Sequence, residues 1–391
     1  MLTWILKRLH GDKMIWIVIF LISLVSLLAI YSSTSALAFR SQGGNTEYYV
    51  LRHLVLLGLG FVVMFAVHHI NYRIFARISN ALLLMTIPLL LYTLLQGSEI
   101  NEAARWITIL GQSFQPSDLA KLALIIYLSK LLTQRQRVIK DFTEGFLPAL
   151  FWVVVICGLI APADLSTSVL LFATSVMIMF VAGIDLKYIG TLLAVAALGL
   201  FILFSTAKRA STWKSRMKAF YGQNISSEKR HIHQTVQANI AISSGGLFGK
   251  GVGKSSQRNF LPQAYSDFVY AIIIEEYGLV GGVLVLMLYL FLLFRSVSIV
   301  TVSKTFGALL AAGLCFIIVL QALINMGVTV GLLPVTGLPL PMISMGGTSI
   351  VFTGVFLGII LSVSRDALES KEERPKTTQR GTRRQRLSLN R

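Results

Sequence analysis

The chain has 391 residues, of which 55% are hydrophobic and only 13% are charged, and its formal net charge is +18. This composition excludes a soluble globular domain and indicates an integral membrane protein, because the apolar runs reach the ~20 residues that a helix needs to cross a bilayer. Nucleic acid is also excluded as a partner, since Lys and Arg in a membrane protein mainly set the topology and meet anionic membrane lipids.

Ten apolar segments predict ten membrane-spanning helices, because the alternating pattern of barrel strands is absent from the sequence. They cover residues 14–37, 49–67, 78–95, 117–132, 146–161, 167–183, 186–206, 268–294, 306–330 and 348–363. Most short loops with Lys and Arg fall on one side, which the positive-inside rule assigns to the cytoplasm. We therefore expect an all-α polytopic membrane protein, with a membrane domain over residues 1–363 and both termini in the cytoplasm.

The two ends of the chain need separate interpretations. Lys7, Arg8 and Lys13 precede the first apolar segment and Ala36–Ala38 follow it, as in a secretory signal peptide. We interpret this segment as a retained helix, since its apolar run is longer than a usual signal core. Residues 364–391 carry nine Lys and Arg, which predicts a disordered basic tail along the cytoplasmic leaflet.

A long loop, residues 207–267, separates the seventh and eighth predicted helices on the extracytoplasmic side and carries ten Lys and Arg. Long loops are translocated largely regardless of charge, so this loop does not contradict the topology. Its charge indicates an anionic partner. The alternative is a solvated loop that meets anionic lipid headgroups.

The end of this loop, residues 245–267, has a composition suited to a diphosphate. Its glycines allow a close backbone approach, and Lys250, Lys254 and Arg258 supply positive charge. It is not a Walker loop, because no strand precedes it. Asp267 stands where the loop meets the eighth helix, so its carboxylate can serve as a general base. Glu275 and Glu276 follow about 12 Å deeper by helical rise, where acids need partners.

Two further polar clusters fall on the same side. Asp118 and Lys121 are three residues apart, hence on one helix face, and an ion pair at a membrane helix implies a polar pocket. In the alternative interpretation the pair is structural, and Arg105 with its neighbour Trp106 is an interfacial anchor. Asp164 heads the sixth helix, and taken alone it is most simply a helix cap.

Residues 325–349 cannot remain helical throughout. They contain three prolines, at positions 334, 339 and 341, together with Gly337 and the pair Gly346 and Gly347. Non-helical backbone is tolerated near a membrane only where it lines a cavity. We expect an ordered re-entrant or outer loop.

This stretch resembles the signature of the FtsW, RodA and SpoVE membrane proteins, the SEDS family, in which an Asn and spaced glycines lead to the pattern PxTGxPLPxxSxGGxS. Residues 105–121, 164–167 and 245–278 are similar to the other blocks of that family, in the same order. The stretch 266–278 looks more like the division branch, FtsW, than the elongation branch, RodA. Asp118 and Gln263 stand where the family has glutamates, and Ser166 where it has a glycine.

The resemblance implies a peptidoglycan glycosyltransferase that polymerises lipid II on the outer face of the cytoplasmic membrane, at the division septum. It implies Asp267 as the catalytic residue. The substrate, lipid II and the undecaprenyl-diphosphate-linked glycan, is expected at Arg105, Asp118, Lys121, Asp164, Lys250, Lys254, Gln257, Arg258, Asn325 and Ser344. A divalent cation, Mg²⁺ or Mn²⁺, is compatible with the family, but no cluster of metal ligands in the sequence points to one.

The implied partners are a class B penicillin-binding transpeptidase, which crosslinks the new strand, and other division proteins. Three alternatives stay open at this point: a lipid II flippase, an elongation polymerase, and a scaffold that docks a division protein. We see no internal repeat of the kind common in transporters, and the polar motifs gather on one side, which favours chemistry there.

Overall fold

A computed structural model of the chain describes residues 11–388 apart from 36, 39–44, 97, 101–102, 110–111, 207–209, 222–228, 262–263 and 302. Within its helices and strands, the description also leaves out some side chains, including those of residues 103–105 and 370–388.

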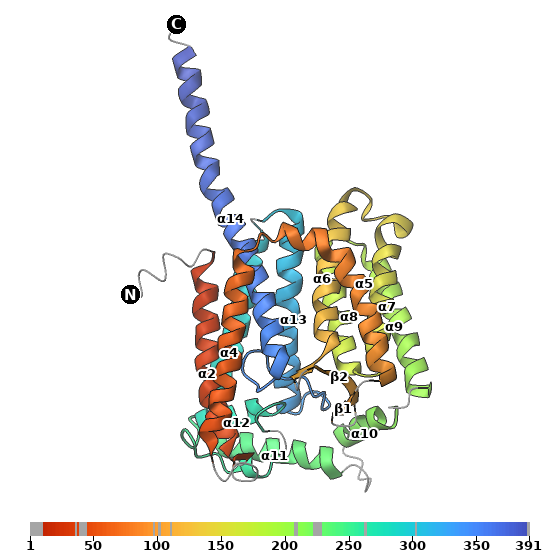
Figure 1. Ribbon diagram of the computed structural model, residues 1–391, viewed down its shortest axis with the longest axis vertical. Helices are drawn as coiled ribbons and strands as arrows, with labels where there is room; N and C mark the ends of the chain where they lie inside the picture. Colours follow the sequence, from red (N-terminus) through yellow and green to blue (C-terminus); the bar gives the residue numbers. More distant parts are fainter. Residues whose placement is uncertain are drawn as a thin grey trace.

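Long helices stand side by side and alternate in direction, forming one bundle (Figure 1). They are α2 Lys13–Ser33, α4 Thr46–His69, α5 Arg73–Gln96, α6 Pro116–Gln134, α7 Leu147–Ile160 with the preceding turn Phe142–Phe146, α8 Leu165–Ala182, α9 Leu186–Thr206, α12 Val269–Val300, α13 Thr305–Thr329 and α14 Gly347–Ser388. Among the described residues, eight helices are long and apolar enough to cross a membrane. α6 carries three charged residues and α9 contributes a shorter apolar stretch, Leu186–Phe201, and together they complete the ten expected helices in the described part of the chain.

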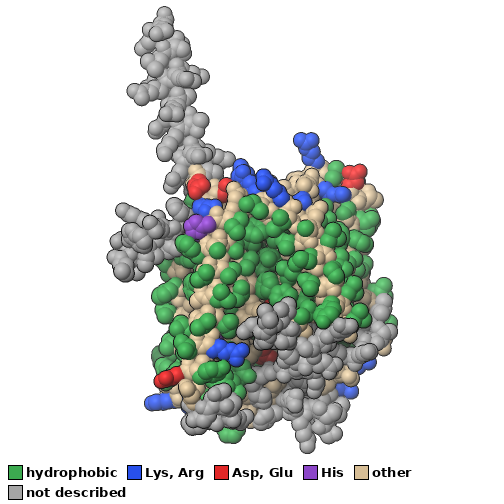
Figure 2. Space-filling model, in the orientation of Figure 1, with side chains coloured by type: hydrophobic (Ala, Val, Ile, Leu, Met, Phe, Trp, Pro, Cys, Tyr) green, Lys and Arg blue, Asp and Glu red, His purple; other side chains and the backbone are tan. Residues whose placement is uncertain are grey.

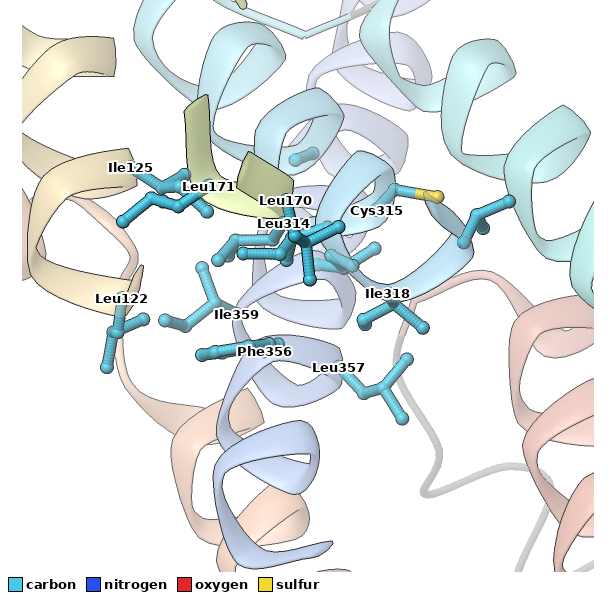
Figure 3. Close-up of a cluster of buried hydrophobic side chains, with 14 of the residues drawn as sticks. Leu122, Ile125, Leu170, Leu171, Leu314, Cys315, Ile318, Phe356, Leu357 and Ile359 are labelled. Atoms are coloured by element: carbon cyan, nitrogen blue, oxygen red, sulfur yellow. The ribbon is translucent and has the colours of Figure 1, made fainter. Parts of the chain in front are cut away.

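The core of the bundle lies where α6, α8, α13 and α14 meet (Figure 3). Leu122, Leu170, Leu314, Ile318 and Phe356 from these helices interlock there. α13 is apolar all round and is the most buried of the eight helices, as expected for a central helix. Both cysteines are free and buried among apolar side chains, so they act as small hydrophobic residues, as predicted.

The outer surface of the bundle is a broad band of hydrophobic side chains, with Lys and Arg gathered at its ends (Figure 2). Such a band would be unstable in water but suits the acyl chains of a bilayer. The composition-based prediction of a polytopic helical membrane protein is therefore confirmed.

One end of the bundle, which we call the loop end, carries the elements outside the spans. α10 Ala210–Phe220 and α11 Lys229–Gly245 lie across it, so the loop between α9 and α12 is partly helical (Figure 1). The described N-terminal end of α2 and the extended end of α14 lie at the opposite end (Figure 1). The disorder predicted for residues 364–391 stays a prediction.

A three-stranded antiparallel sheet also belongs to the loop end, and the sequence did not reveal it. β1 Ser98–Ile100, β2 Ala103–Ile109 and β3 Gln112–Phe114 follow in the order β1-β2-β3 between α5 and α6. The outer strands have only three residues each, too few to show an alternating pattern.

α12 is sharply bent rather than straight. Gly278 interrupts it with φ 72° and ψ −172°. In a straight helix, residues 270 and 282 would be about 18 Å apart along the axis, farther than a tyrosine side chain reaches. The Tyr270 hydroxyl nevertheless donates to the carbonyl of Gly282 at 3.0 Å. The segment 269–277 is thus folded back, and the depth predicted for Glu275 and Glu276 from a straight helix was wrong.

Candidate functional site

A cavity of about 250 Å³ opens at the loop end, between the start of α6, the start of α8, the start of α12 and the loop after α13. It brings together four predicted residues, Asp118, Lys121, Asp164 and Asp267. The other residues that line it are Trp106, Gln115, Thr167, Tyr265, Ser266, Gln321, Gly337, Leu338, Pro339, Met345, Gly346, Gly347 and Ser349. The side chain of Arg105, the neighbour of Trp106 in β2, lies outside the described part.

Asp118 and Lys121 form the predicted ion pair, with Lys121 Nζ 2.6 Å from Asp118 Oδ1. Pro116 begins α6, so both residues stand in its first turns, and both are almost fully buried. The other carboxylate oxygen, Asp118 Oδ2, is buried and has no hydrogen-bond partner among the described residues. Because buried polar atoms are normally hydrogen-bonded, this oxygen can accept a hydrogen bond from a ligand in the cavity.

Asp164 has two roles at once. As N-cap of α8 it accepts a hydrogen bond from the backbone N–H of Thr167 at 3.2 Å, so the capping interpretation holds. Its second oxygen accepts from Gln115 Nε2 at 3.3 Å, across the cavity mouth from the residue before α6. Gln115 was not singled out in the sequence, because a lone glutamine before a helix has no distinctive pattern.

The segment 265–267 is held by three hydrogen bonds from other elements. Asn325 Nδ2 donates to the carbonyl of Asp267 at 2.8 Å, and Ser344 Oγ donates to the carbonyl of Ser266 at 2.6 Å. The backbone N–H of Met345 donates to the carbonyl of Tyr265 at 2.9 Å. Asn325 and Ser344 are absent from the cavity wall. In the structure they hold the backbone of the segment that carries Asp267, and their substrate-binding role stays a prediction.

The Asp267 carboxylate accepts a hydrogen bond from Ser266 Oγ at 3.0 Å. Gly337 approaches its other oxygen, since a Cβ on Gly337 would lie 3.6 Å from Asp267 Oδ2. Burial, and after it electrostatic interactions with Tyr49 and Asp267, raise the pKa of the Tyr265 phenol above its ordinary value. Tyr265 therefore stays a protonated donor beside the carboxylate at neutral pH.

The Pro- and Gly-rich loop after α13 lines the cavity, as expected from its composition. Gln321 Nε2 donates to the carbonyl of Pro339 at 2.8 Å, and Ser166 Oγ donates to the carbonyl of Thr336 at 3.1 Å. Non-helical backbone near the membrane is thus paired with side chains of the neighbouring helices. Only the two ends of the stretch are helical: Asn325–Thr329 belongs to α13, and Gly347–Ser349 begins α14.

The basic loop lies elsewhere. Lys250 Nζ stands 2.6 Å from Glu275 Oε1, and that carboxylate also accepts from the backbone N–H groups of Ser256 and Gln257. None of Lys250, Lys254, Gln257 and Arg258 lines the cavity. Lys250 is thus the cationic partner of the buried Glu275. The basic loop does not reach the cavity that contains Asp267.

The glycines of this loop serve the bend of α12. Lys250 N and Gly251 N donate to the carbonyls of Glu275 and Glu276, and Leu279 N donates to the carbonyl of Gly246 at 2.9 Å. A Cβ on Gly278 would lie only 2.2 Å from the carbonyl oxygen of Leu247. The glycines therefore allow the backbone of the loop to approach α12 closely, where the sequence had predicted an approach to a ligand.

No group of three or more His, Cys, Asp or Glu side chains in the described part of the chain is arranged to hold a metal ion. Three carboxylates line the cavity, and their oxygens are donors that Mg²⁺ or Mn²⁺ accepts, but in the described structure they are not gathered around one point. Gln263, the departure from the family pattern, lies outside the described residues.

Comparison with known proteins gives consistent matches along the chain. The model of a family described as cell cycle protein, FtsW/RodA/SpoVE, matches residues 12–369. Stage V sporulation protein E of Bacillus subtilis is 31% identical over 372 residues, covering 92% of this chain and 98% of the relative. A probable peptidoglycan glycosyltransferase FtsW of Geobacter sp. is 32% identical over 367 residues, covering 92% and 98%.

A solved structure also resembles the chain. It is described as "Structural coordination of polymerization and crosslinking by a peptidoglycan synthase complex", and one of its chains matches with a TM-score of 0.69 and 27% identity. The match covers 91% of this chain and 98% of that one.

Proposed function

Because the chain belongs to the cell cycle protein family of FtsW, RodA and SpoVE, we propose that it is a peptidoglycan glycosyltransferase of the FtsW type. It polymerises lipid II into glycan strands and releases undecaprenyl diphosphate. The observation that carries this function is that Asp267 lines the same cavity as the Asp118–Lys121 pair and Asp164.

Asp267 acts as the general base. The 4-hydroxyl of the acceptor GlcNAc is a weak nucleophile at neutral pH, and Asp267 takes its proton as the oxygen attacks the anomeric carbon of the growing strand. The bond from that carbon to the diphosphate oxygen breaks, and the diphosphate leaves with both bonding electrons. The hydrogen bonds from Asn325 and Ser344 to the Asp267 segment hold the base in place during this step.

Lys121 stabilises the negative charge that develops on the leaving diphosphate. Of the described residues that line the cavity, it is the one with a cationic side chain. Its partner Asp118 keeps one buried oxygen without a donor, which is available to a sugar hydroxyl.

The size of the cavity fits a reaction on part of a larger substrate. Its volume of about 250 Å³ is slightly below the roughly 300–1,000 Å³ of pockets that enclose a whole drug-sized ligand. It takes the reacting sugar and diphosphate, while the lipid chain remains in the bilayer.

The loop end faces the outside of the cell in this proposal, and both termini lie in the cytoplasm at the septum. The support is the positive-inside distribution of Lys and Arg, together with the position of the loop end opposite the start of α2 and the extended end of α14. The similar synthase complex couples polymerisation to crosslinking, so we propose a class B penicillin-binding transpeptidase as the partner.

Liposomes distinguish polymerisation from transport of lipid II. Purified protein, with and without the transpeptidase, is reconstituted with fluorescent lipid II, and glycan polymer and transbilayer movement are measured together. The proposal expects polymer that depends on the protein. Translocation of lipid II without polymer would indicate the flippase instead.

A further inference from the structure

Two polar contacts lie at opposite ends of the apolar stretch that α2 and α12 share. At one end, Arg295 Nε donates to Asp12 Oδ2 at 3.0 Å. At the other, Ser32 Oγ donates to Glu276 Oε1. Apart from Lys13, which directly follows Asp12, neither helix carries a charged residue between these contacts, over about 18 positions or about 27 Å at 1.5 Å per residue, close to the thickness of the hydrocarbon core. The level of Glu276 therefore marks the boundary of the core at the loop end.

The glycine-rich loop is fixed at this boundary by its backbone. Leu279 N donates to the carbonyl of Gly246 at 2.9 Å, and Val280 N donates to the carbonyl of Leu247 at 3.2 Å. The amides of Leu279 and Val280 directly follow the bend at Gly278. They begin the part of α12 that crosses the membrane. Residues 246–248 consequently lie at the level where acyl chains meet headgroups, although composition places them in a polar loop.

The side chains at this level are apolar and exposed. Leu247, Phe248 and Val252 are 62%, 83% and 55% exposed. Leu279 and Val280, to whose amides the loop is bonded, are also exposed, and the exposed apolar surface of α12 continues from them through Val283, Leu284, Met287 and Phe291. The loop thus extends the lipid-facing stripe of α12. In water, these three side chains would expose apolar surface without gaining the transfer free energy that burial in the acyl chains supplies.

We propose that residues 247–252 form a membrane wedge whose partner is the lipid surface, with Leu247, Phe248 and Val252 inserted at the boundary between acyl chains and headgroups. The wedge holds the bend of α12 at the bilayer surface, because the same loop supplies the hydrogen bonds on both sides of Gly278. The folded-back segment 269–277, which starts next to Asp267, is thereby held at a constant level relative to the bilayer surface. The proposal does not depend on the reaction at the cavity.

Spin labelling tests this in bilayers of phosphatidylethanolamine and phosphatidylglycerol with the full chain alone. A nitroxide is placed at Phe248→Cys or Leu247→Cys, and its collisions with oxygen, which enters the bilayer, are compared with those of a water-soluble nickel chelate. Leu284→Cys on α12 serves as the lipid reference and Lys254→Cys, at an exposed lysine of the same loop, as the water reference. The two native cysteines are buried, so the unsubstituted protein is the labelling blank.

The wedge predicts an oxygen-to-nickel collision ratio several-fold higher at 248 and 247 than at 254, approaching that at 284. A ratio at 248 equal to that at 254 would overturn it, since the loop would then stand in water. Labels at 247 and 248 shielded from both reagents would also overturn it, in favour of a protein contact. Both side chains are exposed, so the substitutions leave the packing of the fold intact.

Discussion

Asn325 holds Asp267 by its backbone: the side-chain amide of Asn325 donates to the carbonyl of Asp267 and also to that of Leu338, each at 2.8 Å. One buried amide thus joins the end of α13, the segment before α12 and the loop that lines the cavity. The family resemblance had indicated Asn325 as a substrate-binding residue. In the structure its two donor hydrogens are already committed.

Replacing Asn325 by Leu should lower the turnover number about 10- to 100-fold with little change in the KM for lipid II, because the base moves while the binding groups remain. The matched control is Thr329→Val, which removes one buried hydrogen bond on the same helix, to the carbonyl of Asn325. Steady-state polymerisation kinetics compare the two. Equal turnover in both variants would contradict the positioning role.

The Asp118–Lys121 pair allows stability and activity to be separated. Lys121→Met leaves a buried carboxylate without its partner and should destabilise the protein by about 3–5 kcal/mol. Adding Asp118→Leu should restore most of the melting temperature but no polymerisation, since the cavity then lacks its cation. If the double variant made glycan at the normal rate, the pair would be only structural.

Gly278 should not tolerate a side chain. Alanine there combines a backbone conformation that is essentially confined to glycine, with φ 72° and ψ −172°, which costs about 1–3 kcal/mol for another residue, with a Cβ only 2.2 Å from the Leu247 carbonyl oxygen. Gly253→Ala is the control, because Gly253 also has a positive φ, of 74°, but open space around its Cβ. Thermal unfolding should show a much larger loss for Gly278→Ala, and similar losses would argue against the close approach.

Substitutions of Lys250 and Lys254 should have different effects on the melting temperature. Lys250→Gln leaves the buried Glu275 without its cation, so the melting temperature falls while the KM for lipid II stays the same. Lys254→Gln, at an exposed lysine, should change neither quantity. A rise in KM for both variants would restore the diphosphate-binding interpretation of this loop.

The fold class and the grouping of Asp118, Lys121, Asp164 and Asp267 were predictable because they depend on local patterns. Apolar length sets the helices, the charge distribution sets their direction, and together they place all four residues at one end. The spacing of Asp118 and Lys121 on one helix face was enough to predict the ion pair.

The bend of α12 and the purpose of the glycine loop were not predictable, because both depend on contacts between distant parts of the chain. Gly278 lies in an apolar run that looks like one helix, and its conformation is stabilised by amides some thirty residues earlier. Lys250 lies in a glycine-rich basic segment that resembles a phosphate-binding loop, and only the folded chain shows that it pairs with Glu275. Likewise, Asn325 and Ser344 belong to a recognisable motif, but only the folded chain shows that their side chains donate to the carbonyls of Asp267 and Ser266.

The most direct test of the catalytic role is polymerisation of lipid II by purified protein with its transpeptidase, comparing the unsubstituted chain with Asp267→Asn. This change keeps the shape of the side chain and the acceptor for Ser266 Oγ, so the melting temperature should be unchanged. We predict that no glycan polymer forms, because an amide cannot take the proton of the acceptor hydroxyl. Polymer formed by Asp267→Asn at the rate of the unsubstituted chain would contradict the assignment of Asp267 as the base.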